Sequence, residues 1–272
     1  MSLINRNEII DIYNNEYIEN KLSTLYLDNK YNKYKGYFWN QFKKYNLKTK
    51  TNKEVNKKYS FNEDFFENID NEIKAYWLGF ISADGYLTNP RKNNNSSLGI
   101  ALSIKDKHML ELFNRDIESD VKIHKYISSG GYSKNKEYVR VLYRSDKLTD
   151  DLIKHGVVYH KTDKLKFPIN MIPNNLIRHY IRGYFDGDGS VWKCKNGKIG
   201  LSINGTYDFL NTLSDILYIN NIIYKKPKIS SEKNTKIIYC IKFGRNSDIE
   251  NIYHYFYDNS IRYLERKKEK FK

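Results

Sequence analysis

The chain has 272 residues, enough for one large domain or a main domain with a small appendage, and its 47 Lys and Arg outnumber its 32 Asp and Glu to give a formal net charge of +15. With 25 tyrosines as well, this composition favours a polyanionic partner, most simply nucleic acid. The two cysteines form no disulfide or zinc pattern, no apolar run approaches ~18 residues, and the N-terminus lacks a signal-peptide core. We therefore expect a soluble intracellular protein without a membrane partner.

Residues 1–58 are predicted to form a small helical extension. Apolar residues recur at helical spacing in 8–15 and again in 34–46, and the second of these helices is basic. Lys43 and Lys44 lie off its apolar face, which suits a helix-turn-helix-like module laid against DNA. The last eleven residues of the extension are polar and basic and are predicted to be a linker. The alternative is a solvated basic helix that binds nothing.

From residue 59 onward the chain contains the same pattern twice. The segment 99–105 (GIALSIK) recurs as 199–205 (IGLSING), and longer strand and helix patterns recur in the same order. We predict a first repeat over 59–167 and a second over 168–272. Each repeat has the order helix, strand, strand, helix, so two such units form a pseudo-dimer in one chain.

The predicted strands have one apolar face and one polar face. Leu98, Ile100 and Leu102 alternate with Ser103 and Lys105, which places the apolar set against helices. The later strands repeat this pattern. The polar or basic residues assigned to the open faces are Ser103, Lys105, Arg140, Arg144, Ser202, Asn204, Lys236 and Lys242.

Two glycine-rich segments, 77–86 (WLGFISADGY) and 181–190 (IRGYFDGDGS), are predicted to be helices that end in Asp-Gly. Each contains small residues four positions apart, which leaves a helix stripe almost without side chains and allows two helix backbones to approach closely. These small residues are Gly79 and Ala83 in the first segment and Gly183 and Gly187 in the second.

If the two copies pack on each other, Asp84 and Asp188 lie at adjacent helix C-termini. The helix dipole disfavours negative charge there, and two close carboxylates repel each other unless they are protonated or bridged by a cation. A divalent metal beneath a phosphate fits this arrangement, and hard oxygen ligands suit Mg²⁺. A calcium-binding loop is the alternative reading of DGDG, but its template fails because Val191 and Trp192 follow directly.

The paired segments, their spacing and the strand patterns between them resemble the signature of the LAGLIDADG homing endonucleases over about residues 59–272. The resemblance implies an α+β fold in which two pseudo-symmetric αββαββα repeats form a saddle, with the signature helices at the pseudo-twofold axis. The small N-terminal α-helical domain is additional. One position departs from the pattern, because Ser82 stands where the second copy has Asp186. That position usually packs or caps the helix, so the departure does not put catalysis in doubt.

The same resemblance implies the roles of particular residues. Asp84 and Asp188 would be the acidic metal ligands, together with the backbone oxygens of Ala83 and Gly187. The saddle would lie in the DNA major groove, which makes the open-face residues and the extension lysines candidate DNA contacts. Basic residues near the scissile phosphates would stabilise charge. Candidates for this role are Lys161 and Lys267, with Lys242 and Arg140 as weaker ones, and for each of them a simple DNA-backbone contact or a solvated charge is the alternative.

We therefore expect a monomeric homing endonuclease that makes Mg²⁺-dependent double-strand breaks in DNA at a long asymmetric target and leaves short 3′ overhangs. Mn²⁺ should substitute for Mg²⁺, and Ca²⁺ should bind without supporting cleavage. Two other functions remain open at this point. One is an intron RNA maturase, alone or in addition to cleavage, and the other is a non-catalytic DNA-binding regulator.

Overall fold

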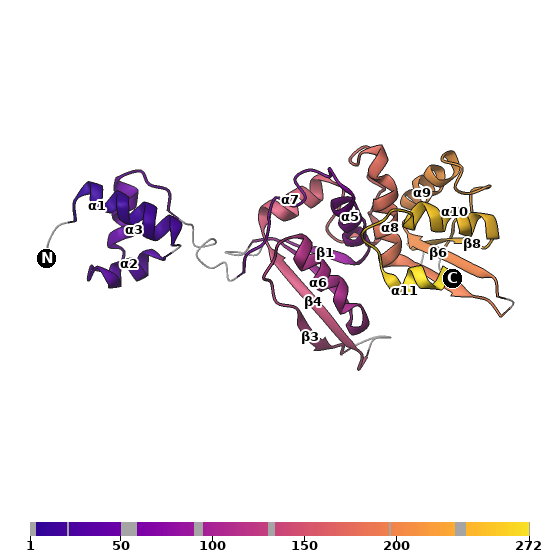
Figure 1. The fold of residues 1–272 in the computed structure, drawn as a ribbon, viewed down its shortest axis with the longest axis horizontal. Coiled ribbons are helices and arrows are strands. Elements are labelled where there is room, and N and C mark those ends of the chain that lie inside the picture. Colours follow the sequence, from indigo (N-terminus) through magenta and orange to yellow (C-terminus); the bar gives the residue numbers. More distant parts are fainter. Residues whose placement is uncertain are drawn as a thin grey trace. The chain divides into compact units, whose positions relative to one another are not determined.

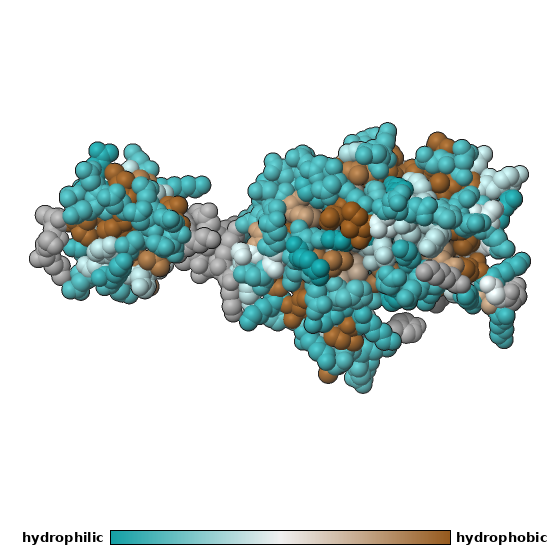
Figure 2. All heavy atoms as spheres, viewed as in Figure 1, coloured by the Kyte–Doolittle hydropathy of each residue, from teal (hydrophilic) through white to brown (hydrophobic). Residues whose placement is uncertain are grey.

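The chain divides into two compact units, residues 1–58 and 59–272, each with its own hydrophobic core. The computed structural model describes residues 4–20, 22–49, 59–89, 95–129, 134–195, 197–231 and 238–271 (Figure 1). The visible face of both units is mainly hydrophilic (Figure 2). Within the described ranges, no helix is both long enough and apolar enough to cross a membrane.

The smaller unit is helical, and a buried carboxylate fixes the start of its last helix. It contains α1 (Arg6–Asp11), the π-helix η1 (Ile12–Glu19), α2 (Thr24–Lys30) and α3 (Tyr37–Lys44). Asp28 is 1% exposed and accepts hydrogen bonds from the backbone N–H of Gly36 at 2.6 Å and of Phe38 at 2.9 Å. Gly36 has a φ of 90°, a left-handed conformation that glycine adopts without strain. The α2–turn–α3 geometry is therefore held by specific bonds. The core residues are Ile9, Ile12, Tyr17, Leu27, Tyr37, Phe38 and Phe42.

The larger unit contains two halves with the same order of elements. The first half contains α5 (Glu72–Asp84), β1 (Gly85–Thr88), β2 (Ser97–Ser103), η2 (Ile104–Asp106), α6 (Lys107–Asp116), β3 (His124–Ile127), β4 (Glu137–Arg144), α7 (Asp146–Lys154) and η4 (Lys161–Asp163). The second half contains η5 (Asn174–Leu176), α8 (Ile177–Asp188), β5 (Gly189–Lys193), β6 (Ile199–Gly205), α9 (Tyr207–Ile219), β7 (Ser230–Ser231), β8 (Tyr239–Phe243), α10 (Asn246–Tyr257), α11 (Glu265–Lys268) and η6 (Glu269–Phe271).

Each half forms one antiparallel four-stranded sheet. The strand orders are β1-β2-β4-β3 and β5-β6-β8-β7, so the two sheets have equivalent topology. Each half therefore reads αββαββα, and the predicted α+β fold with two repeats is confirmed.

Burial largely follows the predicted alternation along the strands. Val139, Val141 and Tyr143 are at most 1% exposed, whereas Arg140 between them is exposed. Cys240 and Gly99 are exceptions, because alternation assigns both to the open faces and yet Cys240 is only 2% exposed and Gly99 is buried. Alternation gives the direction of a side chain but not whether neighbouring residues cover it.

Helices α5 and α8 lie side by side at the centre of the larger unit (Figure 1). A Cβ atom added to Gly79 would lie 2.0 Å from the carbonyl oxygen of Tyr180, and one added to Gly183 would lie 2.0 Å from that of Tyr76. The two glycines thus make reciprocal contacts with the backbone of the partner helix. The predicted small-residue stripes do face each other.

A buried ion pair joins the two halves beside this contact. Arg182 on α8 is fully buried and donates to the carboxylate of Glu72, the first residue of α5, at 2.7 Å. Three further N–H groups are directed at the carbonyls of Phe256 and Arg262 and at the ring of His179, so that four of the five are accounted for. A buried charge is tolerated only when it is paired and its hydrogen bonds are made. Here the guanidinium is paired with Glu72 and makes hydrogen bonds through all three of its nitrogens.

We predict that Gly183→Ala destabilises the larger unit by ~1–3 kcal/mol or more, because even one methyl group overlaps the α5 backbone. In an ordinary helix position the same change stabilises by up to ~1 kcal/mol, so the sign itself is informative. Urea unfolding monitored by circular dichroism measures the effect. Gly244→Ala is the control, since a Cβ there meets nothing within 4 Å. Equal unfolding midpoints for the Gly183 variant and wild type would contradict the close contact.

Candidate functional site

Asp84 and Asp188 are the last residues of α5 and α8, as predicted. The glycine that follows each aspartate leaves the helix with extended backbone and donates its N–H to the last turn. Because the helices are in backbone contact, their C-terminal ends meet. A Cβ atom added to Gly187 would lie 3.4 Å from Oδ2 of Asp84 and 2.2 Å from the Cβ of Ala83. The two carboxylates therefore share one end of the helix pair.

The electrostatics of this pair favour a bound cation. Burial first and then the negative charge of Asp188 raise the pKa of Asp84 to about 6, and Lys161 and Lys267 oppose the shift. The surrounding protein also raises the pKa of Asp188, although its side chain reaches solvent. Both shifts mean that the ionised pair is less stable here than in water.

Each of the two predicted lysines caps the last turn of one of these helices. Three carbonyl oxygens surround each ammonium group, which uses all of its N–H donors. The positive charge thus lies where the helix dipole is negative. Lys161 on η4 donates to Ile81 at 2.9 Å, to Ser82 at 2.8 Å and to Ala83, and Lys267 on α11 donates to Phe185 and Asp186 at 2.7 Å and to Gly187 at 3.3 Å.

Burial makes the charged form of both lysines less stable, and the neighbouring aspartates make it more stable. Burial lowers the pKa of Lys161 and of Lys267 to about 8, and the neighbouring aspartates limit both shifts. The family resemblance implies charge stabilisation at the scissile phosphates for these residues, with a DNA-backbone contact or a solvated charge as the alternative. The structure brings both of them to the acidic pair, where their N–H groups bond to helix carbonyls.

The position at which the first signature segment departs from the family pattern, Ser82, is buried, as is its counterpart Asp186. Ser82 donates its hydroxyl to the carbonyl of Leu78 at 2.8 Å. Asp186 is 1% exposed and accepts from the hydroxyl of Tyr76 at 2.8 Å and the backbone N–H of Leu264 at 2.7 Å. Both side chains make internal bonds, in keeping with the expected packing role.

The donor set suits a hard divalent cation. Within the described ranges there is no cluster of three or more His, Cys, Asp or Glu residues that could hold a metal. The protein instead offers two carboxylates, and the carbonyls of Ala83 and Gly187 keep a second lone pair beside the lysine bond. Mg²⁺ is commonly bound by one or two carboxylates and completed by substrate phosphates and water. The residues present fit such an ion.

The candidate DNA contacts fall into three groups. Arg140, Arg144 and Lys242 are exposed on the open faces, and Arg140 lies 5.4 Å from the ring centre of Tyr126. Ser103, Ser202 and Asn204 are half-buried on the central strands, with Lys105 exposed just beyond β2. Lys43 and Lys44 are exposed on α3 of the smaller unit. Lys236 lies outside the described residues.

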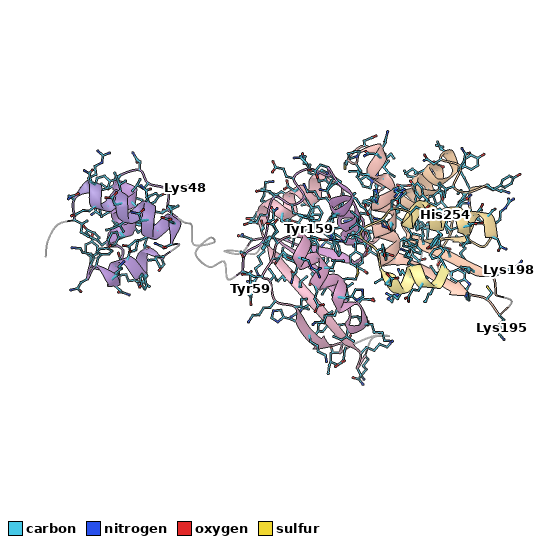
Figure 3. The ribbon with its side chains drawn as sticks, in the orientation of Figure 1. Lys48, Tyr59, Tyr159, Lys195, Lys198 and His254 are labelled. Atoms are coloured by element: carbon cyan, nitrogen blue, oxygen red, sulfur yellow. The ribbon has the colours of Figure 1, made fainter. Side chains whose placement is uncertain are left out.

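Two aromatic rings and a basic turn on these faces were not selected from the sequence. Tyr86 and Trp192 are 39% and 38% exposed, and each ring covers a glycine of the adjacent strand, Gly99 and Gly200 respectively. Their signal was an aromatic residue opposite a glycine in predicted neighbouring strands. The β5–β6 hairpin also carries Lys195 and Lys198 at its far end (Figure 3).

Comparison with known proteins identifies the fold. Residues 175–259 match the family model of the LAGLIDADG-like domain. The homing endonuclease I-WcaI bound to its DNA recognition sequence superposes with a TM-score of 0.56 at 18% identity, over 83% of this chain and 97% of that chain. The meganuclease I-SmaMI bound to uncleaveable DNA gives 0.50 at 15% identity, over 75% and 88% of the two chains.

A curated protein also shares sequence with the chain. The replication factor C small subunit of Methanocaldococcus jannaschii is 28% identical over 207 residues, or 76% of this chain. The chain spans about a tenth of the length of that protein. Residues 175–259 of the second repeat thus match the LAGLIDADG-like domain, and the larger unit has the LAGLIDADG fold of homing endonucleases, which confirms the resemblance inferred from the sequence.

We predict that Asp84→Asn stabilises the metal-free protein in a pH-dependent way. The folded pKa of about 6 lies above the ordinary value of 3.8, so ionising this carboxyl costs folding free energy as the pH rises from about 4 to about 6. The variant should exceed wild type by ~1–3 kcal/mol at neutral pH and match it below about pH 4.

Urea unfolding in EDTA across this range measures the difference. Asp150→Asn, which removes an exposed carboxylate from α7, is the matched control. A pH-independent difference between Asp84→Asn and wild type would contradict the raised pKa.

Proposed function

We propose that the chain is a site-specific, metal-dependent DNA endonuclease that makes double-strand breaks at a long asymmetric target and leaves short 3′ overhangs, the activity needed for intron homing. The observation that carries this proposal is the pair of carboxylates at adjoining helix ends, each beside a lysine-capped turn. The fold shared with DNA-bound I-WcaI supports it.

Asp84 and Asp188, with the carbonyls of Ala83 and Gly187, would hold Mg²⁺. When bound, the ion would supply positive charge to offset the charge that develops on a scissile phosphate. Lys161 and Lys267 hold the carbonyls of both helix ends in place and partly offset the repulsion between the acids. Each lysine would serve the half-site on its own side of the helix pair.

The two open faces are proposed to read different halves of the target. The first carries Tyr86, Arg140 and Arg144, whereas the second carries Trp192 and Lys242. Because the two faces present different side chains, one chain recognises an asymmetric sequence. Both halves of the site come from this single chain, so a monomer suffices for cutting both strands. An RNA maturase or a non-catalytic regulator would not need two paired acids.

We predict that Asp84→Asn and Asp188→Asn each abolish double-strand cleavage and leave DNA affinity within about threefold, since the ligand is lost but the open faces are untouched. The substrate is a randomised duplex library from which wild type selects cleaved sequences in Mg²⁺. Mn²⁺ should replace Mg²⁺, and Ca²⁺ should support binding only. Asp150→Asn is again the control. Cleavage by either variant at the wild-type rate would sink the assignment of the metal ligands.

The smaller unit is proposed to bind DNA beside the cleavage site. Helix α3 exposes Trp39, Asn40, Lys43 and Lys44, and the buried carboxylate of Asp28 fixes the start of this helix. The ammonium of Lys43 lies 4.0 Å from the ring centre of Trp39, which pre-orders both side chains. A rigid basic helix after a tight turn is the geometry that enters a major groove.

We predict that deleting residues 1–58 weakens DNA binding and shortens the footprint, yet leaves metal-dependent cutting at high enzyme concentration. The larger unit keeps its complete core, so it should fold alone. The slope of log affinity against log salt should fall in magnitude by ~0.9 for each phosphate that the extension neutralises in the full chain. Lys43→Ala with Lys44→Ala in the full chain should reproduce part of the change. An unchanged footprint and salt slope after the deletion would show that the extension does not touch DNA.

A further inference from the structure

Each of the two lysines at the site is carried by a segment that crosses to the opposite repeat. Lys161 lies in the bridge, residues 161–167, and caps α5 of the first repeat. Lys267 lies in the C-terminal strap, residues 258–271, and caps α8 of the second repeat. Each segment also bonds to the repeat whose helix its lysine does not cap, and the strap in addition bonds to α8 through the carbonyl of Arg262 and the N–H of Leu264.

The strap is fastened to the first repeat by two bidentate ion pairs. Arg262 donates from Nε and Nη2 to the two carboxylate oxygens of Asp116, both at 2.7 Å. Arg266 donates in the same way to Asp106, again at 2.7 Å. Asp106 immediately precedes α6 and Asp116 ends it, so the strap is attached at both ends of this helix. Such paired bonds fix orientation as well as distance.

The bridge is fastened without charge. The hydroxyl of Thr206, the residue before α9, donates to the carbonyl of Leu165 at 2.6 Å, and Leu165 is 4% exposed. Thr206 directly precedes α9 of the second repeat, just as Asp106 directly precedes α6 of the first repeat. The two crossings are thus pseudo-symmetric in place and different in chemistry.

We propose that Arg262 and Arg266 are positioning residues for Lys267, so that one half of the site depends on ion pairs between the repeats while the Lys161 half does not. This inference rests on the proposed endonuclease function. Arg266 directly precedes Lys267 in the chain, so a shift of its guanidinium moves the capping ammonium.

Salt should act on the two halves unequally. The side chain of Arg266 is 48% exposed and that of Arg262 is 18% exposed, so salt screens the first pair more. The hydroxyl-to-carbonyl bond of the bridge is neutral and buried, and salt leaves it unchanged. We therefore expect high salt to slow cleavage in the half of the site that contains Lys267 more than in the half that contains Lys161.

Strand-resolved cleavage tests this difference between the halves. An end-labelled duplex selected by wild type is cut at saturating enzyme, which removes the contribution of binding. Lys267→Met identifies the strand served by the strap, and Lys161→Met identifies the other. Arg266→Ala should slow the Lys267 strand by about tenfold, a change of ~1.4 kcal/mol in the barrier, and leave the other within twofold, so nicked DNA accumulates.

Further variants separate position from charge. Arg266→Lys keeps the positive charge but not the bidentate pair, so it should recover part of the rate. Thr206→Val should slow the opposite strand instead. Lys107→Ala is the matched control, because Lys107 follows Asp106 directly but pairs with Glu111 inside its own helix. It should leave both strands at wild-type rate. Equal slowing of both strands by Arg266→Ala would overturn the proposal.

A second measurement does not depend on cleavage. Hydrogen exchange of the metal-free, DNA-free protein should show faster exchange in 258–271 for Arg266→Ala, and for wild type at high salt, with 161–167 unchanged. If wild type cuts neither strand, the endonuclease proposal fails. Hydrogen exchange still tests whether the ion pair of Arg266 holds the strap in place. Undiminished protection of the strap in Arg266→Ala would overturn the positioning role even in an active enzyme.

Discussion

The backbone contact between α5 and α8 is the constraint on which the rest of the larger unit depends. Gly79 and Gly183 let the helices approach until their C-termini coincide, and the acidic residues at those ends come together as a result. The negative ends of two helix dipoles and two carboxylates repel one another electrostatically when they lie this close together. The buried ammonium groups of Lys161 and Lys267 offset part of that cost, and a divalent cation is suited to offset the remainder.

Much of this arrangement could be predicted because it follows local periodicity. Strand alternation, the small-residue stripes and the terminal aspartates are all read from spacing within one segment. The partners of buried charges could not be predicted, because they lie far apart in the chain: Lys161 bonds to carbonyls about 80 residues away, and Arg182 pairs with Glu72 across 110 residues. An arginine among apolar helix residues ordinarily points to solvent. Only the assembled fold shows that its guanidinium is enclosed.

The two halves have the same topology, but matching positions in them hold residues of different chemistry. Ser82 corresponds to Asp186 within the signature helices, and Asp106 and Thr206 each directly precede an outer helix. In each pair one residue bears a charge and the other is neutral. The two sheets thus share one strand order, whereas the contacts that join each half to its lysine segment are different.

The Glu72–Arg182 pair shows a further consequence of the differences between the two halves. In the alignment of the signature helices that matches Asp84 with Asp188, Arg182 matches Leu78 of the first repeat and Glu72 matches Leu176 of the second. A dimer of two first repeats would bury Glu72 against leucine, and a dimer of two second repeats would bury Arg182 without its carboxylate. A buried charge without a partner is strongly destabilising. The two halves are therefore complementary, and pairing of either half with a copy of itself is disfavoured. If the chain were divided between the halves, they would assemble as a heterodimer.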